Sequence, residues 1–203
     1  MLRQLMVAGL PVLFATTALA ATPSPMNSIP PVDTPRTLRP ILSEAPTRWL
    51  DVGDRAPMFS YLASDGRWHR SEDLLGNGPI LMIFGADAAA LQGLEKMKPA
   101  FAELGVRPVV VLDVATRTAH GMAERLGVTV AMVSDPMCAI AGLYNSLDPR
   151  SGRHSTSYFV VDEKRTIRAM FYGDLPGTPL LVGSCARALG RPLPPGMLST
   201  YGG

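Results

Sequence analysis

One stretch, residues 79–104, constrains the fold of this chain more than any other. It opens with the apolar run Ile80–Phe84, which is too short for a membrane span and suits a strand buried on both faces. After a turn at residues 85–87, apolar side chains recur at helical spacing. These are Ala90, Leu94, Met97, Phe101 and Leu104. The stretch therefore predicts a central buried strand that leads directly into an amphipathic helix.

Later patterns extend this unit into an α/β fold. A β-branched run at 107–114 predicts a second, parallel strand, and a helix from about Thr116 to Leu126 crosses back and ends at Gly127. An extended segment, a short helix, a closing antiparallel pair and a last helix are expected at 128–133, 134–144, 157–172 and 179–189. Asp65-Gly66, ahead of the central strand, predicts the turn of a β-hairpin.

The length, composition and net charge of the chain limit the classes of function that it can have. The 203 residues allow one ordinary domain plus tails, and a hydrophobic fraction of 47% supports a full core without disulfides. The net charge is only +2 and the basic residues are scattered. This argues against nucleic acid or an anionic membrane surface as the main partner.

The N-terminus has the pattern of a secretory signal at residues 1–20. Arg3 supplies the positive region, residues 5–18 the apolar region, and Ala18-Leu-Ala20 a cleavage site. The alternative is an uncleaved membrane anchor. The signal predicts an exported protein, which in a Gram-negative bacterium means the periplasm.

Proline-rich segments flank the domain that we expect over residues 48–190. Residues 21–47 contain seven prolines and should form an extended arm, and residues 191–203 a tail. The arm is either a disordered linker or a strap that docks apolar side chains onto a protein partner. The side chains expected to bind are Ile29, Val32, Leu38, Ile41 and Leu42.

Three motifs carry a family resemblance. They are VGDRAPMF at 52–59, DGRWHRSEDLLG at 65–76 and VSDPMCAIAGLYN at 133–145. With the central strand ending in Phe84, they resemble the thioredoxin-like superfamily, within it the redoxin branch of AhpC/TSA peroxiredoxins and TlpA-like proteins. The resemblance implies a three-layer α/β fold, with a central mixed sheet flanked by helices and an N-terminal β-hairpin extension.

The resemblance also locates a degenerate active site. The family carries CxxC or TxxC in the first helical turn after the central strand, where the helix N-terminus stabilises a thiolate. With Glu95 as the family's glutamate, the two positions fall on Ala89 and Gln92, and no cysteine occurs before Cys138. Thr156 stands where thioredoxins have a cis-proline, so its peptide bond should be trans. Arg153 is expected to be a solvated loop residue, although peroxiredoxins use an arginine nearby to polarise the peroxide.

Cys138 and Cys185 are the two thiols of the chain. Cys138 follows Asp135-Pro136 and is expected in the first turn of a helix, which would lower its pKa. Cys185 falls on the apolar face of the last helix. Three alternatives remain open: a disulfide between them, two separate small core residues, or a reactive thiol at Cys138.

No metal site or cofactor is expected. His69, His120 and His154 lie in unrelated elements, and the CxxxC loop of copper-binding relatives is missing. The eleven methionines are scattered and are interpreted as core packing.

Two main hypotheses for function follow, and a small-ligand carrier remains as a third. The first is an exported, catalytically degenerate redoxin that acts as a binding or structural subunit of a periplasmic or membrane-associated redox enzyme complex, such as the small subunit of a membrane-bound dehydrogenase. The second is a divergent thiol oxidoreductase or peroxidase that uses Cys138, with or without Cys185.

Overall fold

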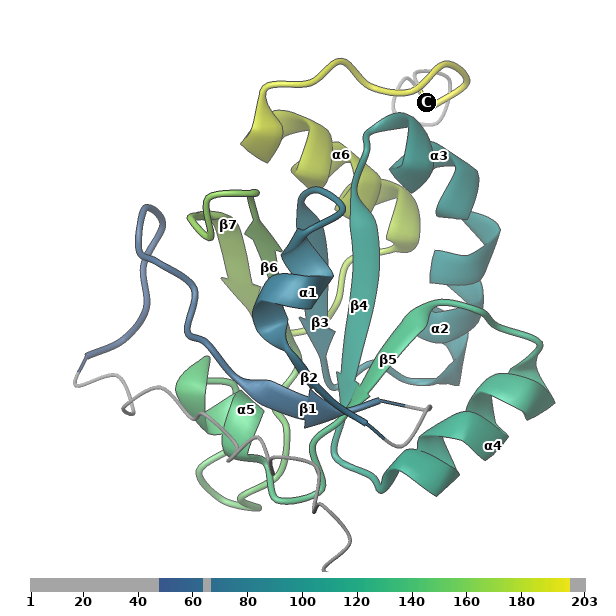
Figure 1. Ribbon diagram of the computed structural model, residues 1–203. Coiled ribbons are helices and arrows are strands. Elements are labelled where there is room, and N and C mark those ends of the chain that lie inside the picture. The colour runs from purple at the N-terminus through teal and green to yellow at the C-terminus, as the bar shows by residue number, and fades with distance from the viewer. Residues whose placement is uncertain (1–47, 64–66, 198–203) are drawn as a thin grey trace, which may run out of the picture. The chain divides into compact units, whose positions relative to one another are not determined.

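A five-stranded mixed sheet organises the protein (Figure 1). The computed structural model describes residues 48–63 and 67–197. The strands lie in the order β5-β4-β3-β6-β7. Their bounds are β3 Ile80–Phe84, β4 Arg107–Leu112, β5 Ala131–Ser134, β6 Ser157–Val161 and β7 Ile167–Tyr172. This arrangement confirms the predicted α/β class.

The predicted central strand β3 is the middle of the sheet. All five of its residues are buried, because it pairs parallel with β4 on one side and antiparallel with β6 on the other. Successive side chains of β3 point to opposite faces. Met82 and Phe84 therefore join one hydrophobic cluster, and Leu81 and Ile83 join the other.

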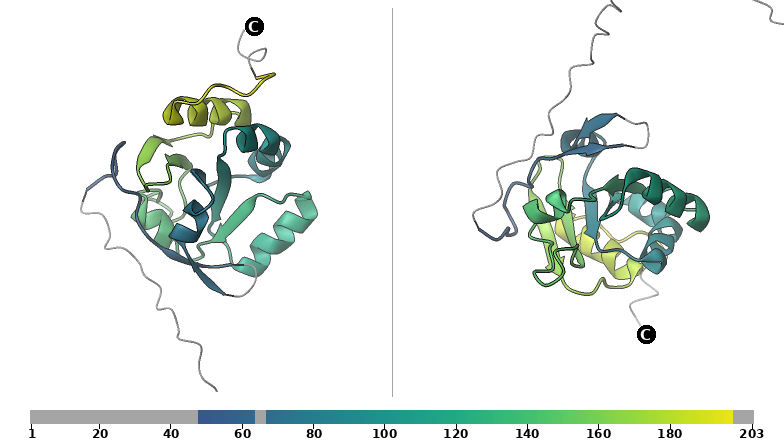
Figure 2. Two further views of the ribbon diagram at one scale, coloured as in Figure 1. Left: turned by 45° about the horizontal axis from the view of Figure 1, so that its top comes forward. Right: turned by 90° about the horizontal axis from the view of Figure 1, so that it is seen from below.

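Helices cover both faces. The Leu81 face is packed by α2 (Ala88–Lys96), α3 (Lys98–Glu103), α4 (Thr116–Leu126) and α6 (Thr178–Leu189). The Phe84 face is packed by α1 (Ser71–Leu75) and α5 (Ala139–Leu143), together with the hairpin strand β1 (Ser60–Leu62), which pairs with β2 (Trp68–Arg70). Figure 2 shows the hairpin and α6 on opposite sides of the sheet. These are the three layers that the resemblance implied.

One predicted helix is in fact two. Apolar periodicity continues from Ala90 to Leu104, but α2 ends at Lys96 and α3 begins at Lys98. Pro99 is the reason, because its ring would clash with the carbonyl of Glu95 and it has no N–H to donate there. The expectation of one continuous helix was wrong at this point.

Other predicted elements are confirmed with small shifts in their bounds. Helix α4 spans Thr116–Leu126 as expected, and Gly127 caps it at φ 63°, a left-handed conformation that favours glycine. The turn at Asp65-Gly66 lies outside the described residues, although the two strands that it would join are paired antiparallel.

At the N-terminal end, the predicted signal sequence and the predicted arm with its apolar side chains lie outside the described residues. Residues 191–197 form no helix or strand, yet Leu193 and Met197 pack against the core beside α6. Within the described part of the chain, no helix is long and apolar enough to cross a membrane.

Candidate functional site

The start of α2, where the family holds its thiolate, carries no reactive group. Asp87 caps the helix, and its Oδ1 accepts a hydrogen bond from the Ala90 N–H at 2.8 Å. Ala89 follows in the first turn and, like Gln92 further along, is exposed. The helix N-terminus predicted from the sequence is therefore present, but its first turn carries an alanine where the resemblance implies a thiolate.

A cavity of about 450 Å³, which we call the α2 cavity, opens beside this turn. Its lining comes from the end of β3, the first half of α2, the residue before β6 and the start of α6. The lining residues include Gly85, Asp87, Ala89, Ala90, Leu94, Thr156, Asp174, Pro176, Thr178 and Leu181. None of the described residues that line it is a cysteine or a histidine, so the cavity has no nucleophile for thiol chemistry.

The backbone at this cavity is tightly packed. Gly85 has φ 64°, and a Cβ on it would lie 3.0 Å from the Cα and the Oγ1 of Thr156. Position 85 therefore requires glycine, both because of its left-handed backbone conformation and because a side chain would have no space. Thr156 itself is trans, since no cis peptide bond occurs in residues 48–63 or 67–197. This agrees with the expectation from the missing proline.

A second group of polar side chains lies where β4 and β5 end, and sequence reasoning missed it. Asp113 follows β4, and Asp135 follows β5. Asp135 is 4% exposed, and its Oδ2 lies 3.1 Å from Nε2 of His154, which is 2% exposed. The same Oδ2 accepts the Ala141 N–H at 2.9 Å. The pair thus ties β5, α5 and the loop before β6 together.

Arg153, expected to be a solvated loop residue, has a specific partner. Its side chain is 65% exposed, but it pairs with Asp113, Nη2 to Oδ2, at 2.7 Å. Hydrogen bonds from Arg153, together with its charge, lower the pKa of Asp113. With Asp113 neutralising it, Arg153 is a poor choice for polarising a bound peroxide.

Cys138 differs from its predicted setting. It is not in the first turn of α5 but is its N-cap residue, in a left-handed conformation with φ 53°. Burial raises the pKa of its thiol, and the nearby carboxylates of Asp135 and Asp113 raise it further, while Arg153 and the backbone N–H of His154 oppose them more weakly. The expected lowering of this pKa was wrong, because the thiol is partly buried and lies near two carboxylates, that of Asp135 three residues before it and that of Asp113 at the end of β4.

Cys185 is fully buried on α6, and burial raises its pKa to about 12. Cys138 packs against the cluster on the Phe84 face, whereas Cys185 belongs to the cluster on the other face. The sheet separates the two thiols, and both are free. Of the three alternatives, the structure therefore contradicts the disulfide.

The two other histidines also have partners within the described chain. His120 pairs with Glu124 along α4, and His69 stacks on Tyr61 at a ring distance of 5.8 Å. Among the residues that the structure describes, no three His, Cys, Asp or Glu side chains are grouped to hold a metal ion.

The sequence did contain a signal that could have placed Asp113 and Asp135 close together. Each of them follows a strand, and adjacent parallel strands end at the same edge of a sheet.

Comparison with solved structures places this fold among peroxiredoxins. The peroxidoxin BcpB from Mycobacterium tuberculosis superposes with a TM-score of 0.61 at 17% identity, covering 70% of this chain and 97% of that protein. AhpC from Enterococcus faecalis gives 0.61 at 20% identity, with 75% and 96% covered. The reduced 2-Cys peroxiredoxin of Plasmodium vivax gives 0.59 at 16% identity, with 68% and 96% covered.

Sequence identities this low show that the fold is shared, and they show no shared activity. No curated protein matches the chain. The sequence model of one family does match, over residues 52–170. That span begins at the VGDRAPMF motif and ends within β7, so it contains β3, β4, β5 and β6 in full and the first part of β7. The chain belongs to the AhpC/TSA family, a thiol oxidoreductase type of family, and has the thioredoxin-like fold of its peroxiredoxins.

Proposed function

We propose that this protein is an exported, catalytically degenerate member of the AhpC/TSA family that acts as a binding subunit of a periplasmic or membrane-associated redox enzyme complex. The small subunit of a membrane-bound dehydrogenase is an example of such a role. The observation that carries the proposal is the start of α2, which holds no cysteine. Ala89, which lines the α2 cavity, and Gln92 occupy the positions that the resemblance assigns to the family's cysteines. Function must then come from surfaces that bind a partner.

The two thiols elsewhere in the chain support the same view. A thiolate is the nucleophile in peroxide reduction and in disulfide exchange. The pKa of Cys138 is raised by burial and by two carboxylates, and Cys185 has no exposed surface. Neither thiol has the electropositive, accessible setting that activates a cysteine.

The alternative is a thiol oxidoreductase or peroxidase reaction at Cys138, with or without Cys185. Its favourable feature is location, because Cys138 is half-buried, near the edge where β4 and β5 end, with the His154 N–H beside it. A role for Cys185 as its partner would need the two thiols to meet across the sheet. We therefore favour the binding role.

The proline-rich arm is where we place partner binding. Removing residues 21–47 should leave the thermal midpoint of the domain nearly unchanged, because both hydrophobic clusters of the described core consist of side chains from Leu50 onward. The same deletion should weaken co-purification with the native partner, because a docking strap spreads its buried area along its length. The measurement compares the midpoint and partner recovery from the native envelope for both forms.

Two substitution sets sharpen this test. Replacing Leu38, Ile41 and Leu42 with serine should reproduce most of the loss of partner, whereas replacing Thr34, Thr37 and Ser43 with alanine in the same segment should retain it. A large fall in midpoint with partner recovery unchanged would show that the arm is part of the fold and would overturn this placement of function.

A further inference from the structure

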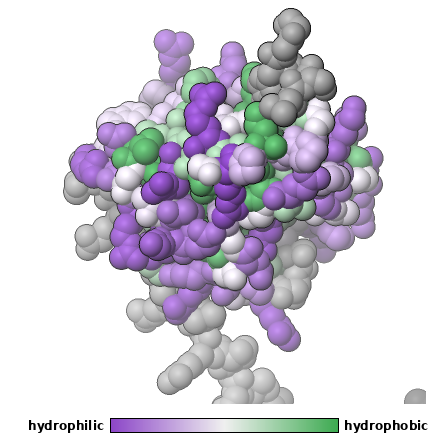
Figure 3. Space-filling view, turned by 90° about the horizontal axis from the view of Figure 1, so that it is seen from above, coloured by the Kyte–Doolittle hydropathy of each residue, from purple (hydrophilic) through white to green (hydrophobic). Residues whose placement is uncertain are grey.

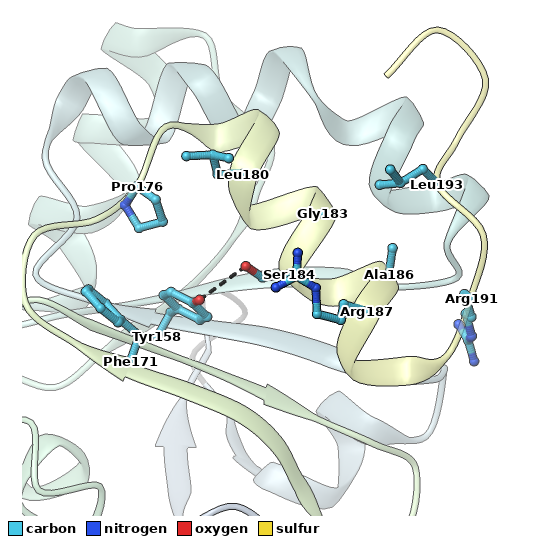
Figure 4. Close-up of a pocket in the computed structure, with 10 residues that line it drawn as sticks. All are labelled: Tyr158, Phe171, Pro176, Leu180, Gly183, Ser184, Ala186, Arg187, Arg191 and Leu193. Carbon is cyan, nitrogen blue, oxygen red and sulfur yellow. Dashed lines mark hydrogen bonds between the residues drawn. The ribbon is translucent and has the colours of Figure 1, made fainter. Parts of the chain in front are cut away.

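A second cavity, of about 500 Å³, lies between the β6–β7 pair, α6 and the segment that follows α6 (Figure 4). Its size falls within the range of about 300–1,000 Å³ typical of small-molecule sites. Six of its lining residues supply the aromatic, aliphatic, hydroxyl and charged groups: Tyr158, Phe171, Leu180, Ser184, Arg187 and Arg191. It is separate from the α2 cavity except for Pro176, which lines both.

The floor and walls of this α6 cavity are apolar. Tyr158 and Phe171 stack with ring centroids 5.8 Å apart and an interplanar angle of 25°. Phe171 is 44% exposed and Leu180 49%, two of the six exposed large hydrophobic residues in the described chain. Figure 3, which views the α6 side of the molecule, shows hydrophobic side chains reaching the surface between polar ones. The cavity thus offers aromatic and aliphatic surface to a ligand.

Two arginines provide the positive charge of the cavity, and only one of them already has a hydrogen-bonding and ion-pair partner. Arg191 donates to the carbonyl oxygen of Leu104 and lies 3.3 Å from the Glu163 carboxylate. The guanidinium of Arg187, in the last turn of α6, has no ion pair or hydrogen bond within residues 48–63 and 67–197. No Asp or Glu is among the described lining residues. The cavity is therefore electrostatically complementary to an anion.

A hydroxyl adds a second donor beside Arg187. The Tyr158 hydroxyl donates to Ser184 Oγ at 3.2 Å, so the proton of Ser184 remains for another acceptor. Ser184 and Arg187 are three residues apart on α6 and therefore lie on one face of the helix, as Figure 4 shows. A guanidinium and a hydroxyl at this spacing suit the two oxygens of one carboxylate.

We propose that the α6 cavity binds a small organic carboxylate with an aromatic or branched apolar body. The carboxylate would pair with Arg187 and accept from Ser184, while the apolar body covers Tyr158, Phe171 and Leu180. Burying an exposed aromatic face and pairing a free guanidinium at once is what distinguishes this ligand from a neutral apolar one. The proposal does not depend on the arm or on the missing cysteines.

The test uses phenylbutanoate as the probe and its neutral amide, phenylbutanamide, as the comparison. Titration of the isotope-labelled protein, followed through backbone amide resonances, should show saturable shifts in β7 and α6 with the carboxylate. Arg187→Gln should weaken phenylbutanoate about tenfold, in line with the loss of a partly exposed charge-assisted hydrogen bond. The amide should bind both proteins equally and about as weakly as the carboxylate binds the variant.

Arg125→Gln is the matched control. Arg125 is likewise an exposed arginine in the last turn of a helix before a left-handed glycine, but it does not line the cavity. It should leave the affinity unchanged. Equal weakening by both substitutions, amide binding as tight as carboxylate binding, or shifts confined to other elements would each overturn the proposal.

Discussion

Replacing Asp135 with alanine should lower the free energy of unfolding by about 3 kcal/mol. The carboxylate is 4% exposed and holds both His154 and the Ala141 N–H. Nδ1 of His154 already has no hydrogen-bond partner and is buried. Without Asp135, the imidazole would have no polar partner at either nitrogen, and the Ala141 N–H would be left unsatisfied in the core.

Urea unfolding of three variants separates this effect from a general loss of charge. Asp135→Asn keeps an oxygen for Ala141 and should cost about half as much as alanine. Asp113→Ala removes a carboxylate of the same edge whose partner Arg153 is 65% exposed, and should cost less than about 1 kcal/mol. Equal losses for Asp113→Ala and Asp135→Ala would contradict the claim that the buried pair stabilises the fold.

Phe84→Ala should cost about 4 kcal/mol. The side chain is fully buried at the end of β3, with ring centroids of His154, Tyr144 and Phe159 at 5.5, 5.6 and 6.0 Å. Alanine would leave a cavity among these rings, which are held by the sheet and α5 and have little freedom to close it.

Two control substitutions show how much of the Phe84→Ala effect comes from the lost volume and from the burial of the site. Phe84→Leu keeps most of the volume and should cost less than about 1.5 kcal/mol. Phe171→Ala removes the same side chain from a position that is 44% exposed and should cost about 1 kcal/mol. If Phe84→Ala cost no more than Phe171→Ala, the aromatic cluster would not be the core of this face.

The sequence could predict much of the fold because its strongest signals are local. The apolar run of β3, the periodicity of α4 with Gly127 and the β-branched strands each depend on residues close in the chain. The break between α2 and α3 had a local signal too, in Pro99, but the apolar spacing on either side concealed it.

The candidate site was less predictable because its properties arise between distant segments. The αL conformation of Cys138 has no sequence signal, since non-glycine residues adopt it rarely. The pKa of this thiol is raised first by burial and then by the carboxylates of Asp135 and Asp113, which the pairing of β5 with β4 brings together. The α6 cavity likewise needs β6, β7 and α6 to be packed before Arg187 and Phe171 share one space.

We propose that this protein keeps the AhpC/TSA fold without thiol catalysis. The most direct measurement is hydrogen peroxide consumption by the purified protein with a dithiol donor, alongside insulin disulfide reduction and a buffer control. We expect no rate above the control, because the α2 turn has no cysteine and the pKa of Cys138 is raised. A reproducible rate that disappears in Cys138→Ser would contradict the claim and establish Cys138 as the nucleophile.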